Sequence, residues 1–162
     1  MTQLTINIEL PNYRMLFRKM PTNEALEESK EYCRNLTITT KAHYNTIRSV
    51  FCPVLNTYVI FNSIGFHHLS YKPDGTARDI SERIFKLQLF PLAVPVIKNS
   101  VGIDEDREVE VAVGRKSKRK IKKGIISSIV AMVGQNNPVP VRVLILKFIG
   151  GKEHIFYSIM KD

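Results

Sequence analysis

The sequence has few of the features that mark exported, membrane-spanning or zinc-binding proteins. Its two cysteines, Cys33 and Cys52, lie far apart and form no Cys-x-x-Cys pair, so they cannot build a zinc site alone. The chain does not open with a basic segment followed by an apolar stretch, and no run approaches the roughly 20 apolar residues of a membrane-spanning helix. We therefore expect reduced, buried cysteines, a cytoplasmic location and no membrane partner.

Several signatures of catalysis are also missing. The sequence contains no P-loop, dinucleotide fingerprint, His-Glu-x-x-His or Gly-x-Ser-x-Gly element. No motif therefore supports nucleotide hydrolysis or serine hydrolase chemistry. A two-metal nuclease needs a cluster of carboxylates. The acidic run Asp104–Asp106 stands in a segment expected to be a loop, and we predict that its charges are simply solvated. We accordingly expect neither a metal ion nor a cofactor.

Charge of one sign dominates most of the chain. The 162 residues carry a formal net charge of +9. Residues 1–35 hold five basic and five acidic side chains, whereas residues 36–162 hold nineteen basic and ten acidic ones, so the whole excess lies after residue 35. A folded basic domain attracts polyanions, most commonly nucleic acid. An anionic membrane surface or an acidic protein would be attracted by the same positive charge. The charge alone therefore indicates an anionic partner and does not say which kind.

Hydrophobic periodicity and turn residues predict an α-rich first half and a β-rich second half. Early strands are expected at Thr2–Leu10, Arg48–Cys52 and Thr57–Phe61, and helices at residues 23–35, 64–69 and 77–89. Residues 36–47 are ambiguous, and Pro91 and Pro95 indicate an extended segment or edge strand at 92–96. Later strands are expected at Val109–Val113, Ile125–Val133, Val139–Phe148 and His154–Met160, the last two joined by a hairpin at Gly150-Gly151.

This order predicts an α+β fold, with N-terminal helices packed on a twisted, mainly antiparallel sheet of four to five strands. A length of 162 residues suits one domain, and 44% hydrophobic residues are enough for one core. In the strand Val139–Phe148 the side chains alternate, so we expect one face of the sheet to be much more apolar than the other.

The densest feature is a basic segment at residues 114–124, between two expected strands. It contains no acid and seven cations: Arg115, Lys116, Lys118, Arg119, Lys120, Lys122 and Lys123. Hairpin tips often carry charge, but seven like charges repel one another and a turn needs no such density. We interpret the segment as a polyanion-binding loop that contacts phosphates, which supplies affinity rather than base specificity.

Two adjacent histidines, His67 and His68, lie in an expected helix and precede the cations Lys72, Arg78 and Arg83. Histidine titrates near neutral pH and suits general acid or base catalysis, while guanidinium groups match the oxygens of phosphate. Neighbouring helical side chains point apart, so one histidine would face a cleft while the other packs. In a purely structural interpretation both histidines pack, and Arg83 pairs with Asp79.

The order of these motifs resembles phage-associated nucleases of the barnase, EndoU, colicin and RelE-like group. In that pattern a strand leads to a helix with a Gly-x-x-His-hydrophobic element, then to a second helix rich in arginine, and then to a four-stranded antiparallel sheet. The matching positions here are Tyr58–Phe61, Gly65–Leu69, Arg78, Glu82, Arg83, Leu87 and Phe156–Ser158. The resemblance covers roughly residues 45–160 as a nuclease-like core and leaves residues 1–44 as an N-terminal extension.

The resemblance implies a metal-independent ribonuclease, commonly a toxin, that leaves a 2′,3′-cyclic phosphate. The active-site residues would be His68, Arg78, Arg83, Tyr157 and Ser158. The histidine would move the proton, the arginines would stabilise the phosphorane, and the two residues of the last strand would donate hydrogen bonds. Lys72 and the basic loop would hold the RNA. His67 has no counterpart in the pattern, so the choice between the two histidines stays open.

Two other classes of function remain open. In a non-catalytic RNA- or DNA-binding module the histidines would be structural, and the basic loop would be the whole function. In an interaction protein the basic face would dock an acidic partner such as an antitoxin or inhibitor. A toxin also needs such a partner, so this interpretation can coexist with the first.

Overall fold

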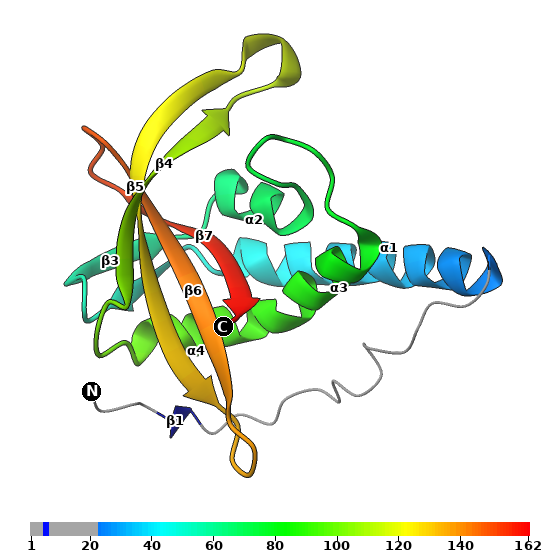
Figure 1. Cartoon of the computed structure of the whole chain (residues 1–162), viewed down its shortest axis with the longest axis horizontal. Coiled ribbons are helices and arrows are strands. Elements are labelled where there is room, and N and C mark those ends of the chain that lie inside the picture. The colour runs from blue at the N-terminus through cyan, green and yellow to red at the C-terminus, as the bar shows by residue number, and fades with distance from the viewer. Residues whose placement is uncertain (1–4, 7–22) are drawn as a thin grey trace.

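The chain folds as helices packed on one mixed β-sheet, an α+β architecture (Figure 1). The computed structural model describes residues 5–6 and 23–162. The sheet is mainly antiparallel, as expected, but within the described residues it contains seven strands instead of four to five. The number is higher because the hairpin at residues 49–60 and a short N-terminal strand join the same sheet.

The strands lie where they are expected, except that β4 begins four residues earlier, within the acidic run expected to be a loop, and β5 begins five residues earlier. They are β1 Thr5–Ile6, β2 Ser49–Cys52, β3 Thr57–Ile60, β4 Glu105–Val113, β5 Lys120–Val133, β6 Val139–Phe148 and β7 His154–Lys161. Their order across the sheet is β1-β5-β6-β7-β3-β2, with β4 also paired to β5. The β1–β5 and β3–β7 pairs are parallel, and the others are antiparallel. Most of the expected strand Thr2–Leu10 lies outside the described residues.

Helices fill the connections between β1 and β4. They are α1 Asn23–Thr46, α2 Ser63–Ser70, α3 Ile80–Leu89 and α4 Ala93–Lys98, and a 3-10 helix at Phe90–Leu92 joins α3 to α4. Helix α1 packs against α3, α4 packs on β2, β5 and β6, and α2 packs on β7. None of the helices in the described part of the chain is long and apolar enough to cross a membrane.

Helix α1 is twice as long as expected, because the ambiguous residues 36–47 are helical. Cys33, Thr40 and Tyr44 are buried at helical spacing, which places them on the face that packs against the core. The Thr37 hydroxyl donates to the Cys33 carbonyl, so a polar β-branched residue is accommodated within the helix. Burial of one stripe therefore outweighs the weak helix propensity of the threonine-rich segment.

The segment around Pro91 and Pro95 is helical, so the expected extended segment at 92–96 is wrong. Pro91 stands at the start of the 3-10 helix and Pro95 in the first turn of α4, where a backbone N–H has no helical partner and proline is tolerated. The driving force is apolar burial, since Leu92, Val96 and Ile97 are almost fully buried.

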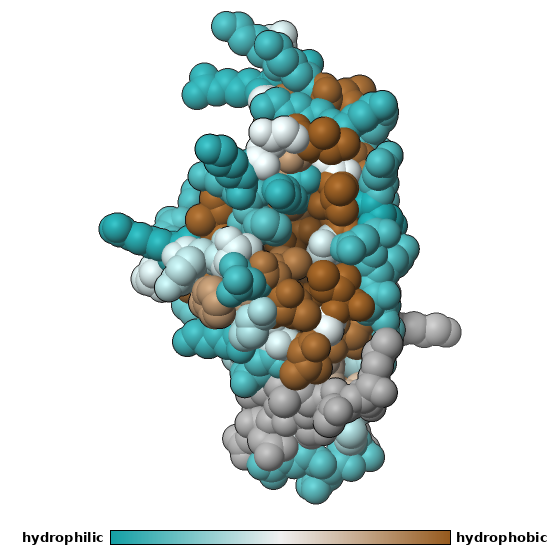
Figure 2. All heavy atoms as spheres, turned by 90° about the vertical axis from the view of Figure 1, so that its left-hand side faces the viewer, coloured by the Kyte–Doolittle hydropathy of each residue, from teal (hydrophilic) through white to brown (hydrophobic). Residues whose placement is uncertain are grey.

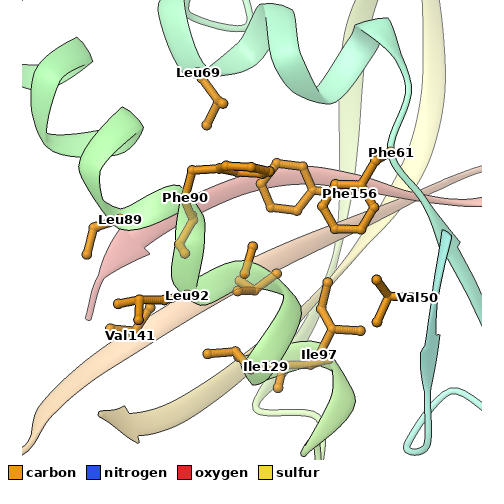
Figure 3. Close-up of a cluster of buried hydrophobic side chains, with 14 of the residues drawn as sticks. Val50, Phe61, Leu69, Leu89, Phe90, Leu92, Ile97, Ile129, Val141 and Phe156 are labelled. Carbon is orange, nitrogen blue, oxygen red and sulfur yellow. The ribbon is translucent and has the colours of Figure 1, made fainter. Parts of the chain in front are cut away.

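The core lies between the sheet and the helices (Figure 3). Phe61 at the end of β3 stacks on Phe156 of β7, with ring centroids 4.9 Å apart. Phe90 and Tyr44 pack against the edges and faces of this pair, and Leu69 of α2 lies above Phe90 in the view of Figure 3. The cluster fixes α2 and β7 against each other, and these two elements carry the candidate site.

Strand β6 is apolar on both faces, contrary to the expectation that one face would be much more apolar. Val143 and Ile145 belong to the core, whereas Leu144 and Leu146 are equally buried in a second cluster on the opposite face. The second cluster also contains Val111, Ile126 and Tyr157. Ile64 at the start of α2 packs against this cluster, so the face is covered where α2 and the β4–β5 hairpin approach it.

Strands β4 and β5 form a long hairpin that reaches beyond the rest of the sheet (Figure 1). Strand β5 begins at Lys120, five residues earlier than expected, and its first four residues pair with β4 alone. A 3-10 turn, Lys116–Lys118, forms the tip. Hydrophilic side chains cover this tip at the top of Figure 2, while apolar side chains gather in the middle of the face shown there.

Candidate functional site

A cleft of about 870 Å³ opens between α2, the turn that follows it and the β4–β5 hairpin. We call it the hairpin cleft. Its polar and charged lining residues are Ser63, His67, His68, Tyr71, Lys72, Arg115, Lys116, Arg119 and Tyr157. The cleft brings together the basic hairpin tip, the two histidines and one residue of β7, three features that are distant in the sequence.

A β-bulge in β7 directs Tyr157 toward α2. Leu144 pairs with Ser158 and Ile145 pairs with Phe156, so Tyr157 is the extra residue between them. A bulge changes the direction in which a strand residue points, and bulges are frequent beside active sites. Tyr157 stacks on His68 with centroids 4.0 Å apart, while Phe156 stays in the core.

His68 is almost fully buried and is held by Arg78. The Arg78 Nη2 lies 3.1 Å from the His68 Nε2, and its Nε donates to the His68 carbonyl at 3.0 Å. A guanidinium can only donate, so this Nε2 must be the acceptor and the proton sits on Nδ1. Burial, followed by the positive charges of Arg78, Lys86 and His67, lowers the pKa of His68 to about 3. His68 is therefore neutral at physiological pH.

Arg78 holds His68 in place through hydrogen bonds and does not line the cleft. Its side chain is 9% exposed, and it also donates to the Glu82 carboxylate. Helix α3 begins at Ile80, not at residue 77, so Arg78 precedes the helix, and its backbone N–H donates to the Ser70 carbonyl. The structure thus places Arg78 beside His68, as the resemblance implies, but with its hydrogen bonds directed to the protein.

His67 is exposed and is one of the residues that line the hairpin cleft. Its ring stacks on Tyr71, one helical turn later, with centroids 4.3 Å apart and planes 8° apart. Partial burial and the nearby charge of Arg119 lower the pKa of His67. No described residue hydrogen-bonds to its ring nitrogens, so His67 is the histidine of the pair that is free to exchange a proton with a ligand.

Arg119 connects the hairpin tip to the turn after α2. Its Nη1 approaches the Asp74 carbonyl at 3.4 Å, and its guanidinium lies over Gly75, where a Cβ atom would meet it. Gly75 has a φ of +85°, which completes the expected turn at Lys72–Gly75. Arg119 therefore bridges the hairpin tip and the Lys72–Gly75 turn, and it is one of the residues that line the cleft.

The basic segment does not act as one loop. Arg115, Lys116 and Arg119 line the cleft together with Lys72. The remaining cations, Lys118, Lys120, Lys122 and Lys123, are exposed outside it. Three of these belong to β5, whose alternation sends successive side chains to opposite faces, and Lys122 lies over the Phe148 ring at 5.5 Å.

Ser158 lies outside the cleft, contrary to the role implied by the resemblance. Its side chain is fully buried, and its Oγ accepts a hydrogen bond from the Nζ of Lys86 at 2.9 Å. Lys86 also donates to the Ile159 carbonyl, and burial lowers its pKa to about 8. Tyr157 lines the cleft, whereas the hydroxyl of Ser158 is bonded to Lys86 and does not line it.

Lys86 is a site-supporting residue that the sequence interpretation missed. It follows Glu82 by four residues, as Glu82 follows Arg78, so Glu82 and Lys86 lie on one side of α3 and Arg78 stands in the segment before the helix. That spacing was the available signal. The stacking partner Tyr71 was likewise missed, although it follows His67 at the helical distance of four residues.

Arg83 also lies away from the hairpin cleft. It lines a second cavity, of about 470 Å³, between α1 and α2. The structural alternative in which its side chain pairs with Asp79 is wrong among the described residues, because the two share only a backbone hydrogen bond. The arginine helix therefore serves two separate places: Arg78 supports His68, and Arg83 faces the second cavity.

The acidic run at 104–106 is not merely solvated. Asp104 and Glu105 approach Arg142 of β6 at 2.8 and 3.9 Å, and Asp162 pairs with the same guanidinium at 2.6 Å. These pairs raise the pKa of Arg142 despite its burial. The ion pairs of Asp104 and Glu105 with Arg142 link the start of β4 to β6 across β5. Within residues 5–6 and 23–162, no group of three or more His, Cys, Asp or Glu side chains is placed to hold a metal ion.

The hairpin cleft thus offers an exposed histidine, a neutral histidine held by arginine, two tyrosines and four cations. Burial raises the pKa of Tyr157, although Arg78 and Arg107 act in the opposite direction, so its phenol stays protonated. Such a set can bind an anion, accept a proton and donate a proton. No family model, curated protein or solved structure matches this chain.

Proposed function

We propose that the protein is an endoribonuclease that cleaves RNA in the hairpin cleft without a metal ion. The observation that carries the proposal is the combination, in one cleft, of the exposed His67, the protonated phenol of Tyr157 and four cations. Ribonuclease chemistry needs these three parts: a base, an acid and positive charge near the phosphate.

The cations of the cleft hold the phosphate backbone. Lys72, Arg115, Lys116 and Arg119 converge from the α2 turn and from the hairpin tip. Arginine binds phosphate oxygens in a bidentate manner and stabilises the extra negative charge of a phosphorane. In this role Arg119 takes the part that the resemblance gives to Arg78 and Arg83, because those two arginines do not line the cleft.

His67 accepts the proton of the ribose 2′-OH as its oxygen attacks phosphorus. Its lowered pKa leaves the ring neutral and ready to act as a base at neutral pH. The bond from phosphorus to the 5′-oxygen breaks, and Tyr157 gives its proton to that oxygen. The products are a 2′,3′-cyclic phosphate and a 5′-hydroxyl. Arg78 and Arg107 stabilise the transient phenolate, since both lower the pKa of Tyr157.

His68 positions this machinery. Its ring forms the surface against which Tyr157 stacks, and Arg78 fixes the ring through two hydrogen bonds. The resemblance to the barnase, EndoU, colicin and RelE-like nucleases supports a toxin-like role for such an enzyme. An acidic antitoxin or inhibitor protein would then cover the basic cleft, and RNA in the cytoplasm would be the target.

The test is cleavage of total RNA by purified protein in EDTA. Discrete fragments with 2′,3′-cyclic phosphate ends are expected from the wild type. His67→Ala should reduce the rate about 10²–10⁴-fold, the scale of one general acid–base group. Lys98→Ala removes an exposed cation of α4 and serves as the control with unchanged rate. Equal rates for His67→Ala and Lys98→Ala would overturn the assigned chemistry.

A second candidate, a non-catalytic RNA-binding module, is favoured by one observation. The Nε2 of His68 is occupied by Arg78 and the pKa of this histidine is about 3, so the motif histidine of the resemblance is unsuited to proton transfer. In that case wild type binds RNA with the same cleft cations but yields no cyclic phosphate from any RNA. RNA binding measured beside cleavage separates the two functions.

A further inference from the structure

The second cavity, which we call the α1–α2 pocket, shares a wall with the hairpin cleft. Ser63, His67 and Tyr71 line both cavities. The stacked rings of His67 and Tyr71 therefore stand between two separate spaces, one of about 870 Å³ and one of about 470 Å³. Both volumes lie within the range of small-molecule binding sites.

Two cations and an aromatic surface line the α1–α2 pocket. The cations are Lys41 of α1 and Arg83 of α3, and the aromatic residues besides the His67–Tyr71 pair are Tyr44, Phe61 and Phe66. Lys41 holds its Nζ 6.0 Å from the centre of the Phe66 ring. Asn45 adds an exposed amide group at the rim. An aromatic face beside paired cations is the combination that binds a base together with its phosphate.

One nitrogen of the Arg83 guanidinium has no hydrogen-bond partner among the described residues. Its Nε is buried, and no described residue accepts a hydrogen bond from it. Arg83 also forms no ion pair within the described part of the chain, in contrast to Arg78 and Arg142. Buried polar groups are normally paired, so a buried guanidinium N–H at a cavity wall that has no acceptor among the described residues points to an anionic ligand.

We propose that the α1–α2 pocket binds the nucleotide next to the one held in the hairpin cleft, so the substrate is single-stranded RNA. This inference rests on the proposed function. Lys41 and Arg83 bind the neighbouring phosphate, and the base lies against Phe66. The His67–Tyr71 pair separates two successive nucleotides, which requires their bases to be unstacked. Bases in a duplex remain paired and stacked, whereas those of loops and single strands can be splayed apart.

The test compares the affinity of the protein for oligoadenylates of one to six nucleotides with 2′-fluoro groups, which cannot attack the phosphate. Wild-type affinity should rise about tenfold or more at the length that fills the second pocket, the scale of one stacked base. Lys41→Gln and Arg83→Gln should lose this step, the rise in affinity at that length, and should bind shorter oligonucleotides as tightly as the wild type does. Lys98→Gln removes one exposed cation elsewhere and should keep the step. For a blunt RNA duplex, affinity should show no such step with length.

Three outcomes separate the inference from the proposed function. If the pocket variants keep the step, or lose the same factor at every length, the pocket proposal is overturned while RNA binding in the cleft stands. If wild type binds no oligonucleotide, the proposed function and the pocket fall together. Arg83 is partly buried, so its variant is first checked for an unchanged unfolding transition. Lys41 is exposed, and its variant carries the test even if Arg83→Gln unfolds.

Discussion

His67 and His68 are consecutive residues of α2, yet one side chain is exposed and the other is buried. His67 is exposed and stacks on a tyrosine of its own helix, whereas His68 is buried between Arg78 and Tyr157. The pKa of both is lowered, but only that of His68 falls to about 3. At the residue scale the structure therefore divides the pair into one group that can exchange protons and one that positions its neighbours.

The pH dependence of cleavage tests the role of His67. A base must be deprotonated to act, and the pKa of His67 is lowered from 6.5 by burial and by Arg119. The rate should therefore rise with pH along an acid limb whose midpoint lies below 6.5, and then stay level through neutral pH. Arg119→Gln should move this midpoint upward, because it removes the charge that opposes protonation. A midpoint that does not move would show that Arg119 does not face the titrating group.

The pH dependence of stability tests the burial of His68. Its pKa is about 3 in the folded chain and 6.5 without the fold, so between these values only the unfolded state takes up the proton. The free energy of unfolding should fall by about 1.4 kcal/mol for each pH unit below 6.5 as a result of this one group. In His68→Gln, whose amide oxygen can still accept from Arg78, that part of the slope should disappear.

The measurement is urea unfolding of both proteins between pH 4.5 and pH 7. The other histidines and the carboxylates titrate equally in the two proteins, so the difference between the two stability curves isolates His68. Parallel curves would mean that His68 reaches solvent and protonates in the folded state.

Element boundaries and contacts decide which of these groups meet. Gly65 lies where α2 crosses β7, and a Cβ there would stand 2.1 Å from the Phe156 carbonyl oxygen and 2.6 Å from the Tyr44 hydroxyl. The glycine of the Gly-x-x-His element is thus required for close packing of the helix on the strand. That packing brings His68 onto Tyr157.

Gly65→Ala should destabilise the protein by about 3 kcal/mol, because the contact is with backbone and a buried ring and cannot be relieved by a flexible side chain. Gly102→Ala is the matched control, since a Cβ at that exposed position meets nothing within 4 Å. It should change the free energy of unfolding by less than about 0.5 kcal/mol. Equal stability of the two variants in urea unfolding would contradict the close approach of α2 to β7.

The sequence predicts most elements because local signals agree with the fold. The Asn62 cap starts α2, the Lys72–Gly75 turn ends the following connection, and Gly150 makes the last hairpin. Prediction failed where burial overrode propensity, as in the second half of α1 and at Pro91–Pro95. The bulge at Tyr157 depends on the register between β6 and β7, which no local pattern encodes. Ser158, which the resemblance puts in the site, is instead bonded to Lys86 and does not line the cleft.

At the scale of the whole molecule, a net charge of +9 is distributed unevenly around one cleft. Lys72, Arg115, Lys116 and Arg119 face its interior, while Lys118, Lys120, Lys122 and Lys123 stand outside it. All eight contribute to the attraction of a polyanion at long range. Contacts that release counterions from RNA, however, require cations that touch phosphates. The two groups should therefore differ in their effect on the salt dependence of binding.

Wild-type affinity for single-stranded RNA should fall with salt in a log–log plot with a slope of roughly −4, from four cations of the hairpin cleft and two of the α1–α2 pocket at about −0.7 each. Replacing Arg115, Lys116 and Arg119 by glutamine should reduce the slope to roughly −2, since one cation of the cleft and two of the pocket remain. Replacing Lys118, Lys120 and Lys123 by glutamine removes the same formal charge from outside the cleft. That variant should bind somewhat more weakly at low salt and keep a slope near the wild-type value. If the two triple variants flatten the slope equally, the RNA follows the hairpin surface as a whole, and the cleft has no privileged role in holding the phosphates.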